Sequence, residues 1–108
     1  MTLTDGQGVN LSRQIPAVDA IHSADGFYTL TNTVKAPAGN KLSEWSGKTA
    51  PSKADCLTQT QTNPKEPITL REGLEFCVST SDQRTVAYVK IDSVENGTVR
   101  LDITVWGN

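Results

Sequence analysis

The chain has 108 residues, a net charge of −2 and an apolar fraction of 36%, which suits one globular domain with a modest core. Its charges are dispersed, so no basic stripe is present for nucleic acid or an anionic membrane surface. No apolar run approaches the roughly 18 residues of a membrane-spanning helix. We therefore expect a single domain, residues 1–108, that itself contacts neither nucleic acid nor a membrane.

The first two thirds of the chain contain only short candidate strands, of which Phe27–Val34 is rich in aromatic and β-branched residues. These predicted strands are Val9–Leu11, Phe27–Val34, Lys41–Trp45 and Asp55–Thr58. The polar tract Gln59–Pro67 follows, and its two prolines cannot donate hydrogen bonds within a sheet. We expect this tract to be an exposed loop or a sheet edge.

The last third contains three runs in which apolar and polar residues alternate, separated by turn residues. They predict a three-stranded antiparallel meander over residues 74–80, 85–93 and 98–106. With no long helical pattern elsewhere, the fold class is all-β. We expect a small antiparallel sandwich or a partly open barrel.

Only one register places every apolar side chain of the meander on one face. For the second hairpin it requires a three-residue turn, Glu95–Gly97, with Gly97 in the left-handed region. The expected pairs are Phe76–Val89 and Val78–Ala87 in the first hairpin, and Leu101–Ile91, Ile103–Val89 and Val105–Ala87 in the second.

The opposite face of the meander divides into two ends. One end carries a row of alternating charge, Glu75, Lys90 and Asp102, which is typical of a solvated surface. The other end is apolar enough to need cover. Its two rows are Cys77–Tyr88–Thr104 and Ser79–Val86–Trp106.

The chain has two cysteines, Cys56 and Cys77, and neither lies in a Cys-x-x-Cys pair. This spacing argues against a zinc or redox site. A small polar all-β domain often carries a disulfide, which favours a Cys56–Cys77 bond over two buried free thiols. Such a bond would hold the earlier half of the chain over the apolar end of the meander and contribute about 3 kcal/mol.

Aromatic side chains are the candidate binding residues, because they recognise sugars and partner proteins at surfaces. The two tryptophans, Trp45 and Trp106, are the leading candidates, but packing in the core or at its rim is the favoured interpretation of both, more strongly for Trp106. As binding residues we predict Trp45 and Tyr28.

The sequence gives little support for catalysis. The single histidine, His22, lies near Asp19, Ser23 and Asp25, but a triad needs a positioned nucleophile and an oxyanion hole rather than local proximity. Neither zinc-ligand spacing nor an Asp-x-Asp-x-Asp-Gly calcium loop occurs. We expect no catalytic residue, no metal and no cofactor.

Several segments together resemble a known domain. Gly8–Leu11, Cys56, Gly73–Thr80 and the ending Ile103–Trp106 are similar to a small all-β domain at the extracellular C-terminus of actinobacterial envelope proteins, including some receptor-type serine/threonine kinases. The similarity depends mainly on the Gly-x-x-(Phe/Leu)-Cys-Val-x-Thr strand and the Val-Trp ending. The chain departs from the pattern at Asn10, where an acidic residue is usual.

This resemblance implies export, a Cys56–Cys77 disulfide and a tether upstream of residue 1. No secretory signal opens the chain, so we expect Met1 to begin a fragment of a longer exported protein, with a cytosolic protein as the alternative. The function we expect is a non-catalytic sensor or interaction module at the cell envelope, whose partner is a small molecule, a wall glycan or a protein. The alternatives are a secreted inhibitor that presents the loop 59–67 and, last, a small hydrolase.

Overall fold

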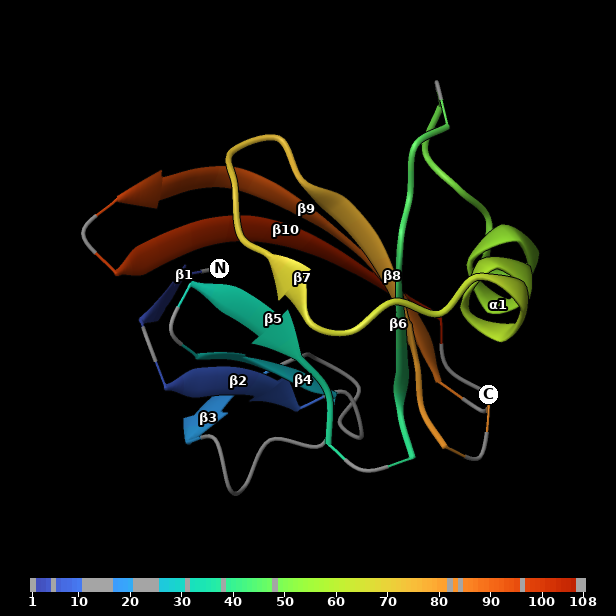
Figure 1. Cartoon of the computed structure of the whole chain (residues 1–108), viewed down its shortest axis with the longest axis horizontal. Helices are drawn as coiled ribbons and strands as arrows, with labels where there is room; N and C mark the ends of the chain where they lie inside the picture. The colour runs from blue at the N-terminus through green and yellow to red at the C-terminus, as the bar shows by residue number, and fades with distance from the viewer. Residues whose placement is uncertain are drawn as a thin grey trace.

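Two five-stranded antiparallel sheets pack face to face in the computed structural model, with one helix beside the first sheet (Figure 1). The structure describes residues 2–4, 6–10, 17–20, 26–30, 32–37, 39–47, 49–81, 83, 85–95 and 97–106. The sheets do not close into a barrel. The all-β sandwich is therefore confirmed and the partly open barrel is not.

The first sheet has the order β1-β10-β9-β8-β6. Its strands are β1 (Thr2–Thr4), β6 (Lys41–Glu44), β8 (Glu75–Ser79), β9 (Val86–Glu95) and β10 (Thr98–Trp106). The second sheet has the order β3-β2-β4-β5-β7. Its strands are β2 (Gln7–Asn10), β3 (Ala17–Ala20), β4 (Phe27–Leu30), β5 (Thr33–Lys35) and β7 (Ile68–Thr69). The helix α1 spans Lys53–Thr62.

The predicted meander is confirmed as β8, β9 and β10, and all five expected strand pairs are present. The predicted three-residue turn is wrong. Thr98 pairs with Glu95, which leaves two residues in the turn, and the register then shifts between Arg100 and Leu101. An Asn-Gly sequence favours a two-residue turn, and the bulge returns the apolar side chains to the inner face. Gly97 has the expected left-handed conformation, with φ +78°.

The core lies between the two sheets. Phe27 of β4 and Phe76 of β8 are both fully buried and meet edge to face, with ring centroids 5.3 Å apart. The fully buried Leu3 of β1 and Val9 of β2 add to the same cluster. The apolar side of the meander therefore faces the second sheet, as its alternation predicts.

The predicted strand Phe27–Val34 is wrong as a single element, because it folds into the hairpin β4–β5. Leu30 pairs with Thr33, and Asn32 in the turn has φ +65°. Asparagine tolerates the left-handed region better than most residues, so a sequence rich in β-formers still reverses direction here. The strands β1, β3 and β7, with two to four residues each, were not predicted as strands.

The predicted strand Asp55–Thr58 is also wrong, because these residues lie in α1. Ser52 caps this helix: its Oγ accepts from the Asp55 N–H at 3.2 Å, while an Asp55 carboxylate oxygen accepts from the Ser52 N–H at 3.0 Å. This reciprocal capping box satisfies two backbone donors at the helix start. The helix ends at Asn63, directly before Pro64, which cannot continue it.

The helix also changes the predicted loop 59–67. Gln59–Thr62 form the last turn of α1, and only residues 63–67 form the exposed connection that the composition predicts. Within α1 the two buried side chains are Cys56 and Thr60. They lie four residues apart and therefore share one face of the helix.

Candidate functional site

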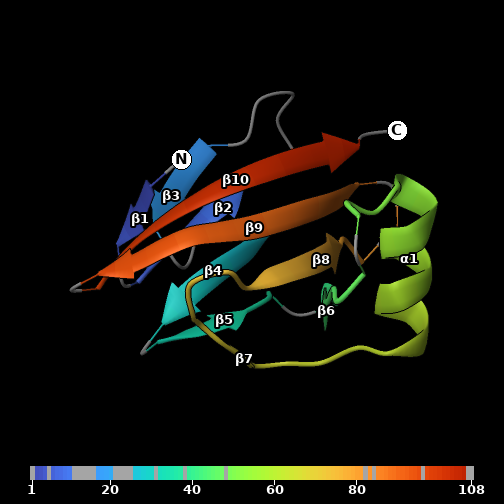
Figure 2. The same ribbon diagram turned by 90° about the horizontal axis from the view of Figure 1, so that it is seen from above.

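A disulfide joins α1 to β8. The Cys56 and Cys77 sulfur atoms are 2.07 Å apart, and both residues are fully buried. The bond confirms the predicted pairing and the prediction that the earlier half of the chain covers this end of the meander. The cover is a helix rather than a strand, and it lies against β6, β8 and β9 (Figure 2).

A second, smaller core surrounds this bond and is separate from the core between the sheets. We call it the disulfide corner, and it comprises Cys56, Cys77 and Val86 with the partly buried side chains of Trp45, Leu57, Tyr88 and Trp106. Both tryptophans thus pack at the rim of the disulfide corner, as the packing interpretation predicts. Trp45 also lines a pocket next to this corner.

The indole of Trp45 is held in one position from two sides. Its Nε1 donates to the Thr49 carbonyl at 2.9 Å. A Cβ atom added to Gly47 would lie 2.6 Å from Cζ2 of the ring, so only glycine fits at residue 47 without a shift of the ring or the backbone. The ring is therefore fixed where the disulfide corner ends and an open pocket begins.

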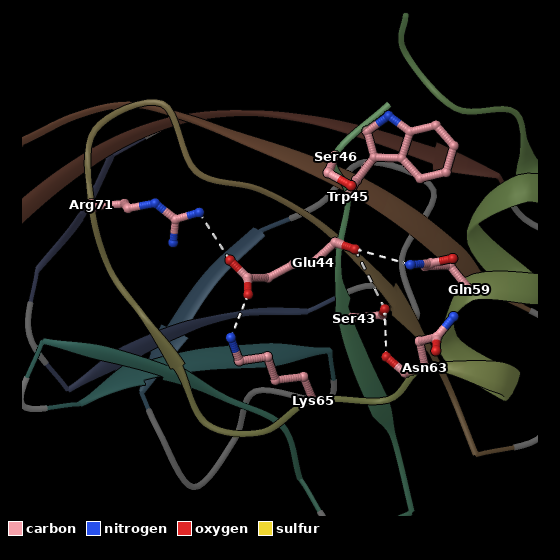
Figure 3. Close-up of a pocket in the computed structure, with 8 residues that line it drawn as sticks. All are labelled: Ser43, Glu44, Trp45, Ser46, Gln59, Asn63, Lys65 and Arg71. Carbon is pink, nitrogen blue, oxygen red and sulfur yellow. Dashed lines mark hydrogen bonds and ion pairs between the residues drawn. The ribbon is translucent and has the colours of Figure 1, made fainter. Parts of the chain in front are cut away.

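This pocket has a volume of about 340 Å³ (Figure 3). We call it the Glu44 pocket. Its lining residues come from β6 and the residues after it, from α1, from the segment after α1 and from the segment between β7 and β8: Ser43, Glu44, Trp45, Ser46, Gln59, Asn63, Lys65 and Arg71.

Two cations converge on the carboxylate of Glu44. Lys65 Nζ lies 2.5 Å from one carboxylate oxygen, and Arg71 Nη2 lies 2.9 Å from the other. Figure 3 shows both side chains pointing toward the Glu44 carboxylate, Arg71 from the left and Lys65 from below. The hydrogen bonds from Lys65 and then Arg71 hold the pKa of Glu44 below its ordinary value, against the smaller opposing effect of burial.

Among the lining residues, two cations face one carboxylate, so the pocket carries a net charge of +1 on a chain whose net charge is −2. The side chains of Lys65 and Arg71 are 60% and 58% exposed, compared with 25% for Glu44. A lysine side chain has about three N–H donors and an arginine side chain about five. Glu44 accepts a hydrogen bond from one donor of Lys65 and from one donor of Arg71. Donors on both cations therefore remain turned to solvent.

The segment after α1 closes the outer edge of β6. Lys65 N–H donates to the Leu42 carbonyl at 2.7 Å, and Ser43 Oγ donates to the Asn63 carbonyl at 2.7 Å. Gln59 Nε2 reaches the Glu44 carbonyl over a longer 3.4 Å. These contacts give the pocket a polar floor of amide and hydroxyl groups.

Tyr88 makes a separate polar contact at the disulfide corner. Its hydroxyl donates to a carboxylate oxygen of Glu75. Burial first, and then the neighbouring Glu75 carboxylate, raise the pKa of Tyr88 to about 12. The phenol therefore stays protonated over the physiological range and acts as a hydrogen-bond donor.

The structure does not bring the predicted site residues together. Trp45 lines the Glu44 pocket, whereas Tyr28 lies on β4 in the second sheet, opposite Lys35 and half-buried. His22, Ser23 and Asp25 lie outside the described residues. A second pocket of about 280 Å³ is lined by Ser93, Glu95, Thr98 and Arg100 at the β9–β10 hairpin, with no aromatic residue.

Sequence reasoning missed the charged part of the site. Glu44 is 21 residues from Lys65 and 27 from Arg71, so no local spacing links them. They meet because β6 is an edge strand, the chain leaving α1 brings Lys65 along it, and the segment between β7 and β8 brings Arg71 to the same place. The Ser52-x-x-Asp55 capping box was the one sequence signal that could have placed the helix at this corner.

No protein-family model, curated protein or solved structure matches the chain. The resemblance to actinobacterial envelope domains accordingly stays a prediction. Within the described part of the chain, no helix is long and apolar enough to cross a membrane. The same residues contain no group of three metal-ligating side chains.

Proposed function

We propose that this domain is a non-catalytic binding module of an exported cell-envelope protein, and that the Glu44 pocket is its ligand site. The observation that carries this proposal is the combination of Trp45 with Lys65 and Arg71 in one pocket. Tryptophan and arginine are among the side chains that most often supply binding energy at protein surfaces, and Lys65 adds a second exposed positive charge beside them.

The disulfide supports export. Disulfides persist in oxidising compartments and are rare in the cytosol, and the Cys56–Cys77 bond joins two fully buried residues. The resemblance of Gly73–Thr80 and Ile103–Trp106 to extracellular actinobacterial domains supports the cell envelope as the location.

The electrostatics favour binding over acid–base chemistry. A general acid or base needs a pKa near the working pH, whereas the pKa of Glu44 is lowered and both of its oxygens are engaged by cations. This carboxylate orients Lys65 and Arg71 instead of exchanging a proton with a substrate.

The secreted-inhibitor alternative would use the loop 59–67. Because α1 extends through Thr62, the segment free to enter a protease cleft in an extended form shortens to residues 63–67. Alanine substitution from Thr60 to Lys65 that abolished binding to a protease would favour this alternative over a ligand pocket.

The test is co-sedimentation of the oxidised protein with insoluble wall polysaccharide isolated from an actinobacterium. We expect binding by the wild type and its loss in both Trp45→Ala and Arg71→Ala. Tyr28→Ala is the matched control, since it removes the other candidate aromatic residue from a strand outside the pocket.

Circular dichroism of each variant checks that the fold is retained, and the exposed Arg71 provides a second variant if Trp45→Ala unfolds. Loss of binding in Tyr28→Ala alone would place the site on the second sheet. Absence of wild-type binding, or binding that survives both pocket substitutions, would contradict the proposal.

A further inference from the structure

We infer that the Glu44 pocket takes an acidic sugar, that is, a pyranose ring that bears a carboxylate. This inference rests on the proposed function of the pocket as a ligand site and names the class of ligand. The pocket has two parts. Lys65 and Arg71 form an anion site for the carboxylate, and Trp45 forms a ring site against which the pyranose packs.

The anion site is organised before any ligand arrives. Glu44 holds Lys65 and Arg71 together with one oxygen for each, so their mutual repulsion is offset and their conformational freedom is reduced. Arg71 keeps further N–H donors in the planar fork that suits a carboxylate. With a net charge of +1 in the pocket, a second carboxylate can bind beside that of Glu44.

The ring site presents carbon rather than a hydrogen-bond donor. Trp45 Nε1 already donates to Thr49, and Gly47 lies close against the same indole. What remains for a ligand is ring surface, and the C–H face of a pyranose packs on such a surface. A preorganised ring also loses little conformational entropy when the ligand binds.

The polar groups between these two parts suit hydroxyls. Gln59 makes one long contact at 3.4 Å, so its side-chain amide can turn to a better partner. Ser46 is exposed and lines the same pocket. Amides and hydroxyls both donate and accept, which matches the mixed character of sugar hydroxyl groups.

A peptide carboxylate is the competing source of the same charge, and the edge of β6 argues against it. Peptides often bind by adding a strand to an open sheet edge. Here the Leu42 carbonyl already accepts from Lys65 N–H, and the Glu44 carbonyl accepts from Gln59. A peptide strand would have to displace the chain that leaves α1.

The pocket size agrees with a small ligand. At about 340 Å³ it lies near the lower limit of the roughly 300–1,000 Å³ range of ligand sites. This volume fits a sugar of few rings, or the end of a polysaccharide chain, better than an extended polymer segment.

The test is a titration of the oxidised, ¹⁵N-labelled protein followed by amide chemical shifts. The probes are D-glucuronic acid, D-glucose and N-acetyl-alanyl-alanine, which separate the carboxylate from the ring. We expect glucuronate to shift amides of residues 44–47, 59–63, 65 and 71, and to bind more tightly than either other probe.

Arg71→Gln should weaken glucuronate binding by about tenfold or more, the effect of losing a hydrogen bond to a charged group. Lys41→Gln is the matched control, because it removes one exposed positive charge from β6, the strand of Glu44, outside the pocket. It should leave the affinity unchanged.

Equal affinity for glucose and glucuronate, or no effect of Arg71→Gln, would overturn the acidic ligand class while leaving the pocket as a neutral-sugar site. Tighter binding of the acetylated dipeptide would assign a peptide carboxylate instead. Absence of glucuronate binding also overturns this inference. The proposed function itself would still stand if Trp45 and Arg71 were required for binding to wall polysaccharide.

Discussion

The two cores of this domain are built differently. Between the sheets, buried apolar side chains from both sheets form one continuous cluster, in which Phe27 packs against Phe76. At the disulfide corner, a mostly polar helix is held by a covalent bond, a cap and a few partly buried rings. The sandwich is therefore a scaffold with a continuous apolar interior, while the disulfide corner depends on a few specific interactions and borders the candidate site.

The largest expected effect is in the core between the sheets. Phe76→Ala removes a fully buried ring, and such a change costs about 3–5 kcal/mol. This is a large fraction of the roughly 5–15 kcal/mol of a typical domain. Urea denaturation followed by tryptophan fluorescence measures it. If Phe76→Ala lowered the free energy of unfolding by less than removal of the disulfide does, the core between the sheets would not be the larger contributor to stability.

The next largest effect concerns the covalent bond. The double variant Cys56→Ala/Cys77→Ala opens a loop with a sequence separation of 21, and we expect the free energy of unfolding to fall by about 3 kcal/mol. Urea denaturation of the oxidised wild type and the variant gives the difference. An unchanged denaturation midpoint would show that packing alone holds α1 in place.

A smaller effect is expected at the start of the helix. Ser52→Ala removes the side chain that accepts from the Asp55 N–H, which costs about 1 kcal/mol. Ser46→Ala is the matched control, an exposed serine outside the helix. Equal stability of the two variants would mean that the cap contributes nothing to the corner.

The smallest effect is electrostatic and depends on pH. Because the folded-state pKa of Glu44 is lowered, its ion pairs stabilise the fold fully above the unfolded-state pKa, and this contribution is lost as the pH falls through the folded-state value. Since both cations are more than half exposed, solvent screening limits the effect to below about 1 kcal/mol.

Glu44→Gln should therefore be less stable than the wild type at pH 7, with the difference closing toward pH 3. Urea denaturation at both pH values measures it. Glu72→Gln, an exposed carboxylate on the same segment as Arg71, is the control for the loss of one negative charge. A difference that grew on acidification would contradict the assigned sign.

The same comparison explains which parts of the structure could be predicted. The meander register follows from alternation, because one face of β8, β9 and β10 must be apolar. The disulfide follows from the small number of cysteines and the polar composition. In both cases the residue types and their spacing are enough to predict the contact, and the structure confirms the strand pairs and the Cys56–Cys77 bond.

The remaining parts depend on contacts that no local pattern encodes. Asn32 reverses the chain inside a run of β-formers, and three threonines of α1 mask a helix that its cap and disulfide stabilise. Of the site, only Trp45 was predicted. Lys65 and Arg71 reach Glu44 through the path of the chain around β6, which the sequence does not reveal.

Separate stabilisation of the disulfide corner is tested most directly by amide hydrogen exchange of the oxidised and the reduced protein, read by peptide mass spectrometry. We predict that reduction speeds exchange chiefly in peptides covering residues 53–62, while peptides from β9 and β10 keep most of their protection. A uniform rise across both sheets, or unchanged protection of α1, would contradict the claim that the disulfide corner is stabilised separately from the sandwich.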